Sequence, residues 1–369
     1  MKPDMINAST INAHYYYPAY EQEMADKFFN AYHLETEENC AVVQISEFKD
    51  RKDRVCRFCH KKSPYVSFHK NAHVVSEMLG NKRFQSDFEC DDCNAIFSKY
   101  ENDLANYLGI IRTVQSVKGK KIPKFKSADK KLSAHVMKED EITNVVEFRR
   151  FEGLNETFEF DKENKQTIVN YTKAPYTPLH VYKALLKMAL SVVDPKHLPD
   201  YNFAFEFLRT KKHDANFSGF AILTRSTMSL TFQFPSPTVM IFRKKDANAK
   251  LFSHIFLLYA QNSIFQIIMP FYLKDRAFYT PTSGPVDTIW CPPLFGNKSL
   301  SQIGPISSLS FNLNGTEKIY NEIESIKIPA LGEDFEISKI INKETGEITE
   351  RKFDGNKIIG IDLMMRQIE

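Results

Sequence analysis

The sequence predicts an α+β protein in which a small zinc-stabilised N-terminal module precedes a larger mixed domain with an antiparallel sheet and at least one packed helix. Three observations predict this class. Two CxxC pairs lie close together near the N-terminus. Short apolar runs separated by polar turns fill the C-terminal half, which is typical of hairpins. One strongly apolar stretch after residue 177 has helical periodicity.

Length and composition agree with a globular protein. A chain of 369 residues suggests two domains, or three. Its hydrophobic content of 43% and charged content of 26% exclude disorder as the main state. The formal net charge of +3 is too small to indicate a polyanion-binding protein without a local cluster of charge. The N-terminus lacks a secretory pattern and the longest apolar stretch, residues 254–273, is interrupted by polar residues and a proline, so we expect a cytoplasmic protein with no membrane segment.

Four segments follow one another along the chain. We expect residues 1–39 to be a helical lead-in, because Tyr20–Tyr32 contains helix formers and a modest apolar stripe. Residues 40–115 contain the cysteine module, and residues 132–369 form the larger C-terminal domain. Between them, residues 116–131 contain seven lysines and one acidic residue. This segment is either a solvated basic linker or an arm that contacts phosphate groups.

The C-terminal domain is expected to be rich in strands around one helix. Strands are predicted at Asn144–Phe151, Thr157–Tyr171, Phe217–Thr224, Met228–Phe234, Thr238–Arg243, His254–Ala260 and Ile264–Pro270. Turns are predicted at residues 225–227 and 261–263. The helix should begin with Thr177 as N-cap and Pro178 as its first residue, and end before Asp194-Pro195.

The cysteines give the strongest signal in the sequence. Cys56 and Cys59 form one CxxC pair, and Cys90 and Cys93 form a second pair after thirty intervening residues. In a chain without an export signal, paired cysteines at this spacing indicate metal ligands and not disulfides. Two such knuckles supply the four thiolates of a tetrahedral structural zinc site. The alternative is two reduced thiol pairs in a core.

Three polar residues accompany the knuckles in a fixed order. His73 and Asn81 lie between the two pairs, and Asn94 directly follows the second. This order inside a four-cysteine frame, with the pattern AH…LGNK…CDDCN…F..YEN.L, resembles the HNH endonucleases over residues 50 to 110. The resemblance implies a treble-clef-like ββα-metal module. The domain order is also similar to that of HNH effectors in bacterial antiphage systems, which carry the nuclease first and a sensor second.

The resemblance implies a role for each residue. His73 would be the general base that activates water for phosphodiester hydrolysis, a task that suits an imidazole titrating near neutral pH. Asn94 would bind a catalytic divalent ion, Mg²⁺ or Mn²⁺, through its amide oxygen, and Asn81 would hold the loop or the histidine by hydrogen bonds. Double-stranded DNA is the expected substrate, and cleavage of RNA stays open. The C-terminal domain would control or target the nuclease in phage defence.

One position departs from the family pattern. Many HNH proteins have an acidic metal ligand directly before the histidine, where this chain has Ala72. A hard cation prefers carboxylates, so a further oxygen ligand is needed. Glu101 is the first candidate, because it lies two helical turns after Asn94 on the same helix face. Glu77 and Asp91 are further candidates.

Two readings of a different kind stay open. The missing carboxylate fits a catalytically silent zinc module that binds nucleic acid or protein. For the C-terminal domain, three roles stay open: binding of a nucleotide signal, binding of a protein partner, and homo-oligomer formation. Residues 132–369 contain no phosphate-binding glycine loop that would favour the nucleotide, so the sequence does not decide among these roles.

Overall fold

The structure is a computed structural model that describes residues 5–7, 15–42, 48–121, 124–138, 144–150, 157–210, 220–279, 286–296, 303–328, 336–342, 348–349 and 358–367. The chain forms two compact units. Unit 1 consists of Met1–Asn102 and Thr177–Glu317, and unit 2 consists of Asp103–Tyr176 and Lys318–Glu369. Each unit is therefore discontinuous in sequence. Both contain helices and antiparallel sheets, so the α+β class is confirmed.

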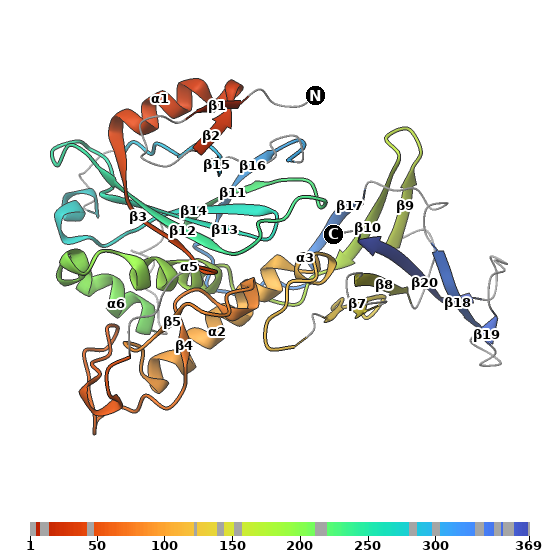
Figure 1. Cartoon of the computed structure of the whole chain (residues 1–369), viewed down its shortest axis with the longest axis horizontal. Helices are drawn as coiled ribbons and strands as arrows, with labels where there is room; N and C mark the ends of the chain where they lie inside the picture. The colour runs from red at the N-terminus through yellow and green to blue at the C-terminus, as the bar shows by residue number, and fades with distance from the viewer. Residues whose placement is uncertain are drawn as a thin grey trace. The chain divides into compact units, whose positions relative to one another are not determined.

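A six-stranded antiparallel sheet is the centre of unit 1 (Figure 1). Its spatial order is β16 (Ser307–Asn312), β11 (Ile222–Thr227), β14 (Ser263–Ile268), β13 (His254–Ala260), β12 (Thr238–Lys244) and β3 (Tyr32–Asn39). Strand β3 belongs to the segment that we expected to be a helical lead-in. It reaches the sheet by pairing with β12, from Thr238 opposite Asn39 to Lys244 opposite Tyr32. A helical pattern in the local sequence gives no information about a strand pairing with residues this far away in the chain.

The strand predictions for this sheet are largely confirmed, with two corrections. The runs at Thr238–Arg243 and His254–Ala260 are strands, and the chain turns at Gln261 and Asn262 between β13 and β14. The turn predicted at residues 225–227 is wrong, because these residues pair with β14 as part of β11. The strand predicted at Met228–Phe234 is also wrong. Two prolines, at 235 and 237, follow this run and lack the amide donors that a ladder needs.

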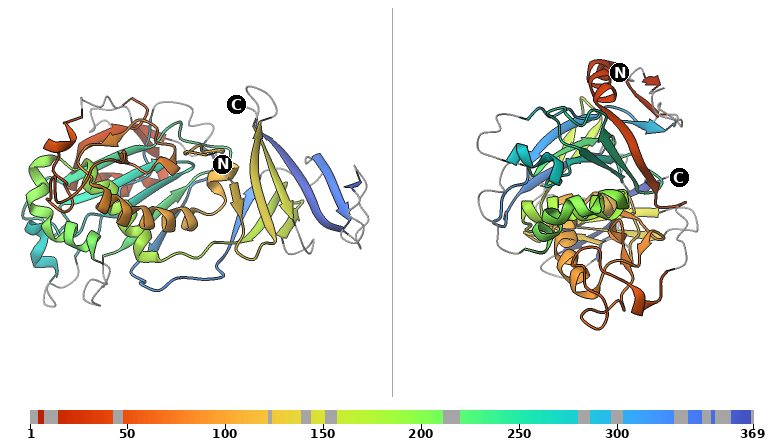
Figure 2. Two further views of the ribbon diagram at one scale, coloured as in Figure 1. Left: turned by 90° about the horizontal axis from the view of Figure 1, so that it is seen from below. Right: turned by 90° about the vertical axis from the view of Figure 1, so that its left-hand side faces the viewer.

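Helices cover both faces of this sheet (Figures 1 and 2). On one face lies α1 (Gln22–Ala31), where the Phe28 ring packs edge-on against Phe242 of β12 at 5.0 Å between centroids. On the other face lie α5 (Pro178–Val192) and α6 (Asn202–Arg209). The hydroxyl of Tyr182 donates to the carbonyl of Ile268 over 2.8 Å and so joins α5 to β14.

Every residue of helix α5 except the partly exposed His180 is buried. As predicted, Thr177 is its N-cap and Pro178 its first residue, and the helix ends before Asp194. A helix that is apolar on all sides needs cover on both flanks. The sheet covers one flank of α5 and the cysteine module covers the other, where Arg57 donates to the carbonyl of Ser191 over 2.6 Å. The sequence expectation of a core helix is thus confirmed.

The cysteine module of unit 1 contains a short hairpin followed by a helix. Strands β4 (Ala72–His73) and β5 (Gln85–Ser86) pair antiparallel, and α2 (Asp91–Leu108) follows them. The chain passes from unit 1 to unit 2 within α2, after Asn102. The remaining elements of unit 1 are a small sheet of β1 (Met5–Asn7), β2 (Tyr15–Pro18) and β15 (Phe295–Gly296), and the 3₁₀ helices η1 (Ala19–Glu21), η2 (Arg51–Asp53), η3 (Glu77–Leu79), η4 (Pro195–Tyr201) and η6 (Leu273–Tyr279).

Unit 2 contains two antiparallel sheets and the short helix α3 (Ile111–Val114). One sheet has the order β17 (Ile323–Ile328), β10 (Gln166–Thr172) and β9 (Phe158–Asp161). The other has the order β19 (Ile348–Thr349), β18 (Glu336–Asn342), β20 (Ile358–Gln367), β8 (Asn144–Arg150), β7 (Leu132–Lys138) and β6 (Lys124–Lys126). Strand β6 lies within the segment expected to be a basic linker. No helix in the described part of the chain has the length and apolar character to cross a bilayer.

Candidate metal centre in the cysteine module

The four cysteines of the two CxxC pairs form one cluster. The sulfur atoms of Cys56, Cys59, Cys90 and Cys93 all lie within 4.8 Å of one another, and those of Cys59 and Cys90 are 3.8 Å apart. Tetrahedral zinc with Zn–S bonds of about 2.3 Å places neighbouring sulfurs roughly 3.8 Å apart. No disulfide joins these cysteines. The four thiols therefore fit a structural zinc ion, as predicted.

Local backbone structure explains why the four sulfurs converge. The first pair lies on a tight turn, where the amide of His60 donates to the carbonyl of Cys56 over 2.8 Å and His60 has a positive φ of 58°. The second pair lies at the N-terminus of α2, where the amide of Asn94 donates to the carbonyl of Cys90 over 2.9 Å. A knuckle and a helix start thus each present two sulfurs, close enough together for one metal ion to bind all four.

Asp91 stabilises the loop that leads into this helix. Its carboxylate accepts hydrogen bonds from the Ser67 hydroxyl and from the backbone amides of His69 and Lys70, over 2.6 to 3.0 Å. Burial raises the pKa of Asp91, but these hydrogen bonds outweigh it and lower the pKa to about 2. A further candidate ligand, Glu77, lies 3.8 Å from the ammonium of Lys82. In the structure Asp91 thus supports the fold of the knuckle.

Two of the three HNH-type residues lie on the hairpin. His73 ends β4 and is partly buried, and its carbonyl accepts a hydrogen bond from Lys187 over 2.6 Å. Asn81 lies in the connection to β5 and is fully buried. Its amide nitrogen donates to the carbonyls of Val75 and Phe84, and its oxygen accepts from the amides of Arg83 and Phe84. Asn81 therefore fixes the connection that follows His73.

The third residue, Asn94, and the candidate metal ligand Glu101 both lie on α2. Asn94 is partly buried in the first turn, next to the cysteine cluster, and its carbonyl accepts from the Ser98 hydroxyl over 2.7 Å. Glu101 is also partly buried, and its carboxylate accepts from the Ser76 hydroxyl over 2.8 Å and lies 3.6 Å from the ammonium of Lys187. A divalent ion at Glu101 would therefore compete with Lys187 for the carboxylate.

Lys187 is the residue in this region that the sequence analysis missed. It projects from the middle of α5 and pairs with Glu89 at 3.1 Å, with both side chains 1% exposed. Two carboxylates and the His73 carbonyl face its ammonium group. Burial lowers the pKa of Lys187, but the attraction of Glu89 and Glu101 outweighs burial, so the pKa is raised and the ammonium stays charged. Burial raises the pKa of Glu89 to about 7 against the attraction of Lys187.

This network links the hairpin, the helix and α5 around one ammonium group. The His73 carbonyl is on β4, Glu89 precedes Cys90, and Glu101 is on α2. Lys187, whose ammonium lies 3.1 Å away, stabilises the buried Glu89 carboxylate. The signal available in the sequence was the presence of two lysines, Lys183 and Lys187, on an otherwise apolar helix.

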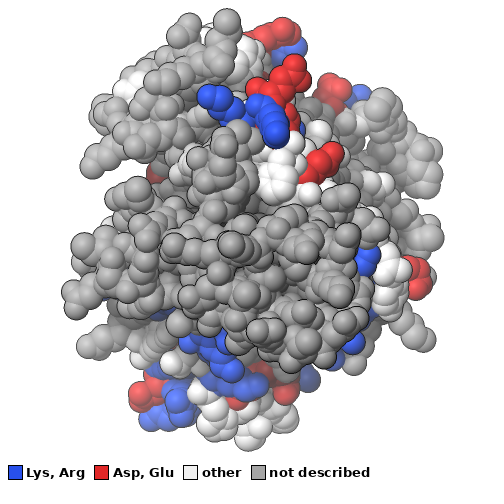
Figure 3. All heavy atoms as spheres, turned by 90° about the vertical axis from the view of Figure 1, so that its right-hand side faces the viewer, with Lys and Arg blue, Asp and Glu red and all other residues white. Residues whose placement is uncertain are grey.

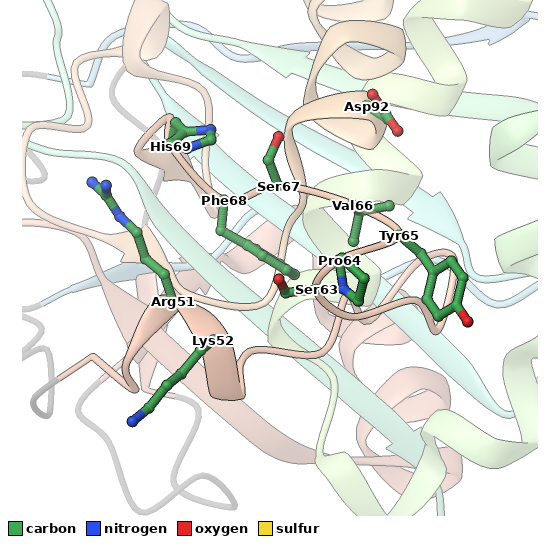
Figure 4. Close-up of a pocket in the computed structure, with 10 residues that line it drawn as sticks. All are labelled: Arg51, Lys52, Ser63, Pro64, Tyr65, Val66, Ser67, Phe68, His69 and Asp92. Carbon is green, nitrogen blue, oxygen red and sulfur yellow. The ribbon is translucent and has the colours of Figure 1, made fainter.

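A pocket of about 490 Å³ lies beside the first knuckle. It is lined by Arg51 and Lys52 of η2, by the loop 63–69 and by Asp92 of α2. Figure 4 shows Arg51 extending toward the side of the pocket where His69 lies, whereas Lys52 points away. The Arg51 guanidinium on one wall suits an anionic ligand, and the carboxylate of Asp92 on α2 opposes this preference.

The described side chains on the face shown in Figure 3 give no stronger indication of a binding surface. On the face of the molecule shown in Figure 3, basic side chains of described residues lie beside acidic ones. This mixture agrees with the small net charge of the chain. Surface charge of this kind does not by itself identify a nucleic-acid-binding face.

Comparison of the chain with protein-family models, with curated proteins and with solved structures gave no significant match. The family resemblance therefore rests on the residues of the module themselves. Among the described residues, groups of three or more Cys, His, Asp or Glu side chains close enough to share an ion occur at the cysteine cluster and at Glu35, His197 and His254. His73 and Glu101 belong to neither group.

Proposed function

We propose that the chain is a metal-dependent endonuclease of the HNH type that hydrolyses phosphodiester bonds in DNA. The observation that carries the proposal is the order of elements around the cysteine cluster. A hairpin with His73 on its first strand and Asn81 in its connection leads into a helix with Asn94 in its first turn. The first CxxC pair precedes this hairpin and the second pair begins the helix, and the four sulfurs lie within 4.8 Å of one another.

In this proposal His73 accepts a proton from the attacking water. The imidazole suits this role because its ordinary pKa lies near neutral pH. Lys187 holds the His73 backbone and Asn81 holds the connection behind it, so the strand that carries the base is fixed at two points. Asn94 offers an amide oxygen next to the cysteine cluster. A bound Mg²⁺ or Mn²⁺ would offset charge on the phosphate group.

The test compares two histidines of the same module. Purified full-length protein, loaded with zinc, is incubated with supercoiled plasmid in Mg²⁺, in Mn²⁺ and in a chelator for divalent ions. We expect nicking that depends on the divalent ion and that falls by about 10²-fold or more in His73→Ala, the range for loss of a general base. His69→Ala is the matched control, because the His69 side chain is 74% exposed and contacts Asp91. Equal cleavage by wild type and His73→Ala would reject the assignment of the base.

The second candidate is a catalytically silent zinc module that binds nucleic acid or protein. Two observations favour it: Ala72 replaces the usual acidic ligand, and Glu101 faces Lys187 in place of a free metal position. Binding to DNA that weakens steeply with salt, without nicking in Mg²⁺ or Mn²⁺, would favour this function. The Arg51→Ala variant should weaken such binding if the pocket contacts phosphate.

We further propose that the part of the chain after residue 132 controls the nuclease, as in the antiphage effectors that share this domain order. A non-specific nuclease is toxic and needs restraint. Plasmid nicking that rises on addition of a cyclic nucleotide would support control by a nucleotide signal. Constitutive nicking that no cyclic nucleotide alters would argue against it.

A further inference from the structure

Unit 1 contains a second group of potential metal ligands, none of which belongs to the cysteine module. It consists of Glu35 on β3, His197 on η4 and His254 at the start of β13, whose ligand atoms all lie within 4.8 Å of one another. The Nε2 atom of His197 is 3.0 Å from one Glu35 oxygen, and the Nε2 atom of His254 is 3.7 Å from the other. Two imidazoles and a carboxylate are a common donor set for zinc.

A β-bulge directs Glu35 toward the histidines. Leu34 pairs with Phe242 and Thr36 pairs with Ile241, so Glu35 is the extra residue on β3 at this point of the ladder. A bulge bends the strand and changes the direction of the inserted side chain, and such bulges are common next to functional sites. Without the bulge, Glu35 would follow the regular alternation of the strand.

Two atoms of this group are buried without a hydrogen-bond partner among the described residues. They are Oε2 of Glu35 and Nε2 of His254. They face each other at 3.7 Å, which is beyond hydrogen-bond distance. His254 is fully buried. A buried polar atom without a partner is costly, and a bound cation would satisfy both atoms at once.

Each of the other imidazole nitrogens has a tyrosine hydroxyl as its hydrogen-bond partner. The Nδ1 atom of His254 is 2.8 Å from the Tyr201 hydroxyl, and the Nδ1 atom of His197 is 3.0 Å from the Tyr272 hydroxyl. When each Nδ1–H donates to its tyrosine, each Nε2 presents a lone pair to the centre of the group. Such outer hydrogen bonds fix the ring orientation and the tautomer of a ligating histidine.

We propose that Glu35, His197 and His254 bind a transition-metal ion of the zinc class through the carboxylate and the two Nε2 atoms. Zinc with bonds of about 2.0 to 2.2 Å places neighbouring ligand atoms roughly 3.3 to 3.5 Å apart, between the two measured separations. Three protein ligands leave one position for water. The ion joins β3, η4 and β13 and needs no part of the cysteine module.

Two basic residues near Glu35 bear on metal affinity. Lys196 lies 3.0 Å and Arg243 lies 3.5 Å from the same Glu35 oxygen. Their side chains are 54% and 40% exposed, so both can turn toward solvent when the ion binds. Lys196 also has Asp194 as a partner at 2.6 Å. Replacement of Lys196 by Gln removes a cation that competes for Glu35 and should therefore increase the affinity for zinc. If the group is only an ion-pair network without a metal, the same substitution should not affect zinc binding.

The experiment counts zinc ions in the full-length protein. The chain is stripped with a chelator, reloaded with excess Zn²⁺, freed of unbound metal and analysed by elemental mass spectrometry. We expect two zinc ions per chain in wild type and one in Glu35→Gln and in His197→Gln. His33→Gln, at an exposed histidine on the same strand, is the matched control and should retain two. One zinc ion in wild type, or two in both site variants, would overturn the proposal.

A spectroscopic arm covers the case in which the site variants fail to fold. Zinc-edge X-ray absorption of the wild type should show sulfur and nitrogen or oxygen neighbours in comparable amounts, because one ion has four thiolates and the other has none. Sulfur neighbours alone would contradict the second site. Neither readout depends on nuclease activity, so the proposed second metal site is tested separately from the proposed function.

Discussion

Replacement of Lys187 by Met tests the buried network that holds the His73 strand. The ammonium lies 3.1 Å from Glu89, and both side chains are almost fully buried. Their direct attraction is about 5 kcal/mol at an effective dielectric constant of 20. The variant loses this attraction, but it also avoids the free-energy cost of burying the lysine ammonium away from water, which offsets part of the loss. What remains is a buried Glu89 without a charged partner, and breaking such pairs costs about 3–5 kcal/mol.

The measurement is urea unfolding of the full-length protein at fixed zinc concentration, followed by circular dichroism. We expect Lys187→Met to lower the free energy of unfolding by about 3–5 kcal/mol. The matched control is Lys27→Met. It removes an exposed ion pair in which the Lys27 side chain is 63% and the Glu23 side chain 84% exposed, and it should leave the free energy of unfolding nearly unchanged.

A double variant separates the ion pair from the loss of the lysine itself. Lys187→Met combined with Glu89→Leu removes both charges and leaves apolar groups of similar size. This variant should be more stable than Lys187→Met alone, because no uncompensated buried charge remains. If the two substitutions are additive within about 0.5 kcal/mol, Lys187 and Glu89 are not coupled and the reasoning is refuted.

Three further predictions concern other parts of the chain. Burial lowers the pKa of Lys183 from 10.5 to about 7. Above pH 7 the unfolded chain therefore binds more protons than the folded chain, so the free energy of unfolding should rise with pH. Relative to Lys183→Met, the rise from pH 7 to pH 9 should be about 2 kcal/mol. An equal pH dependence of the free energy of unfolding in the two proteins, measured by urea unfolding, would contradict this. Gly109 has a φ of +61°, and an added Cβ would lie 2.5 Å from the Tyr171 hydroxyl oxygen. Gly109→Ala should thus lower the melting temperature. The control is Gly296→Ala, because a Cβ added at Gly296 would meet nothing within 4 Å. Equal changes of the melting temperature in the two variants would count against the steric argument. Removal of zinc by a chelator, or Cys56→Ser, should unfold the cysteine module, and amide hydrogen exchange should then become faster in α2 than in β11, which carries none of the proposed zinc ligands. Unchanged protection of α2 would show that zinc is not structural.

The features that the sequence predicted are those with a local signal. The spacing of the two CxxC pairs predicted the cysteine cluster, because a knuckle and a helix start each fix two sulfurs within a few residues. The N-cap and first proline of α5 were likewise predicted from neighbouring residues. The strand prediction at Met228–Phe234 was wrong because it relied on alternating apolar residues alone, although two prolines follow this run.

The features that the sequence did not predict depend on residues far apart in the chain. Glu35 and His254 are brought together by two strand pairings and a bulge, and no spacing rule connects positions 35, 197 and 254. The same holds for Lys187, which meets Glu89 only after α5 has packed against the cysteine module. The nuclease roles of His73, Asn81, Asn94 and Glu101 stay predictions.

The chemistry of the DNA ends is the most direct test of a hydrolytic nuclease. Metal-dependent hydrolysis by the module should leave 5′-phosphate and 3′-hydroxyl ends, so DNA ligase should reseal nicks made by the wild-type protein in Mg²⁺ or Mn²⁺. We expect resealable nicks with wild type and almost none with His73→Ala. An intact plasmid under all divalent-ion conditions, or nicks that ligase cannot close, would contradict the proposed function.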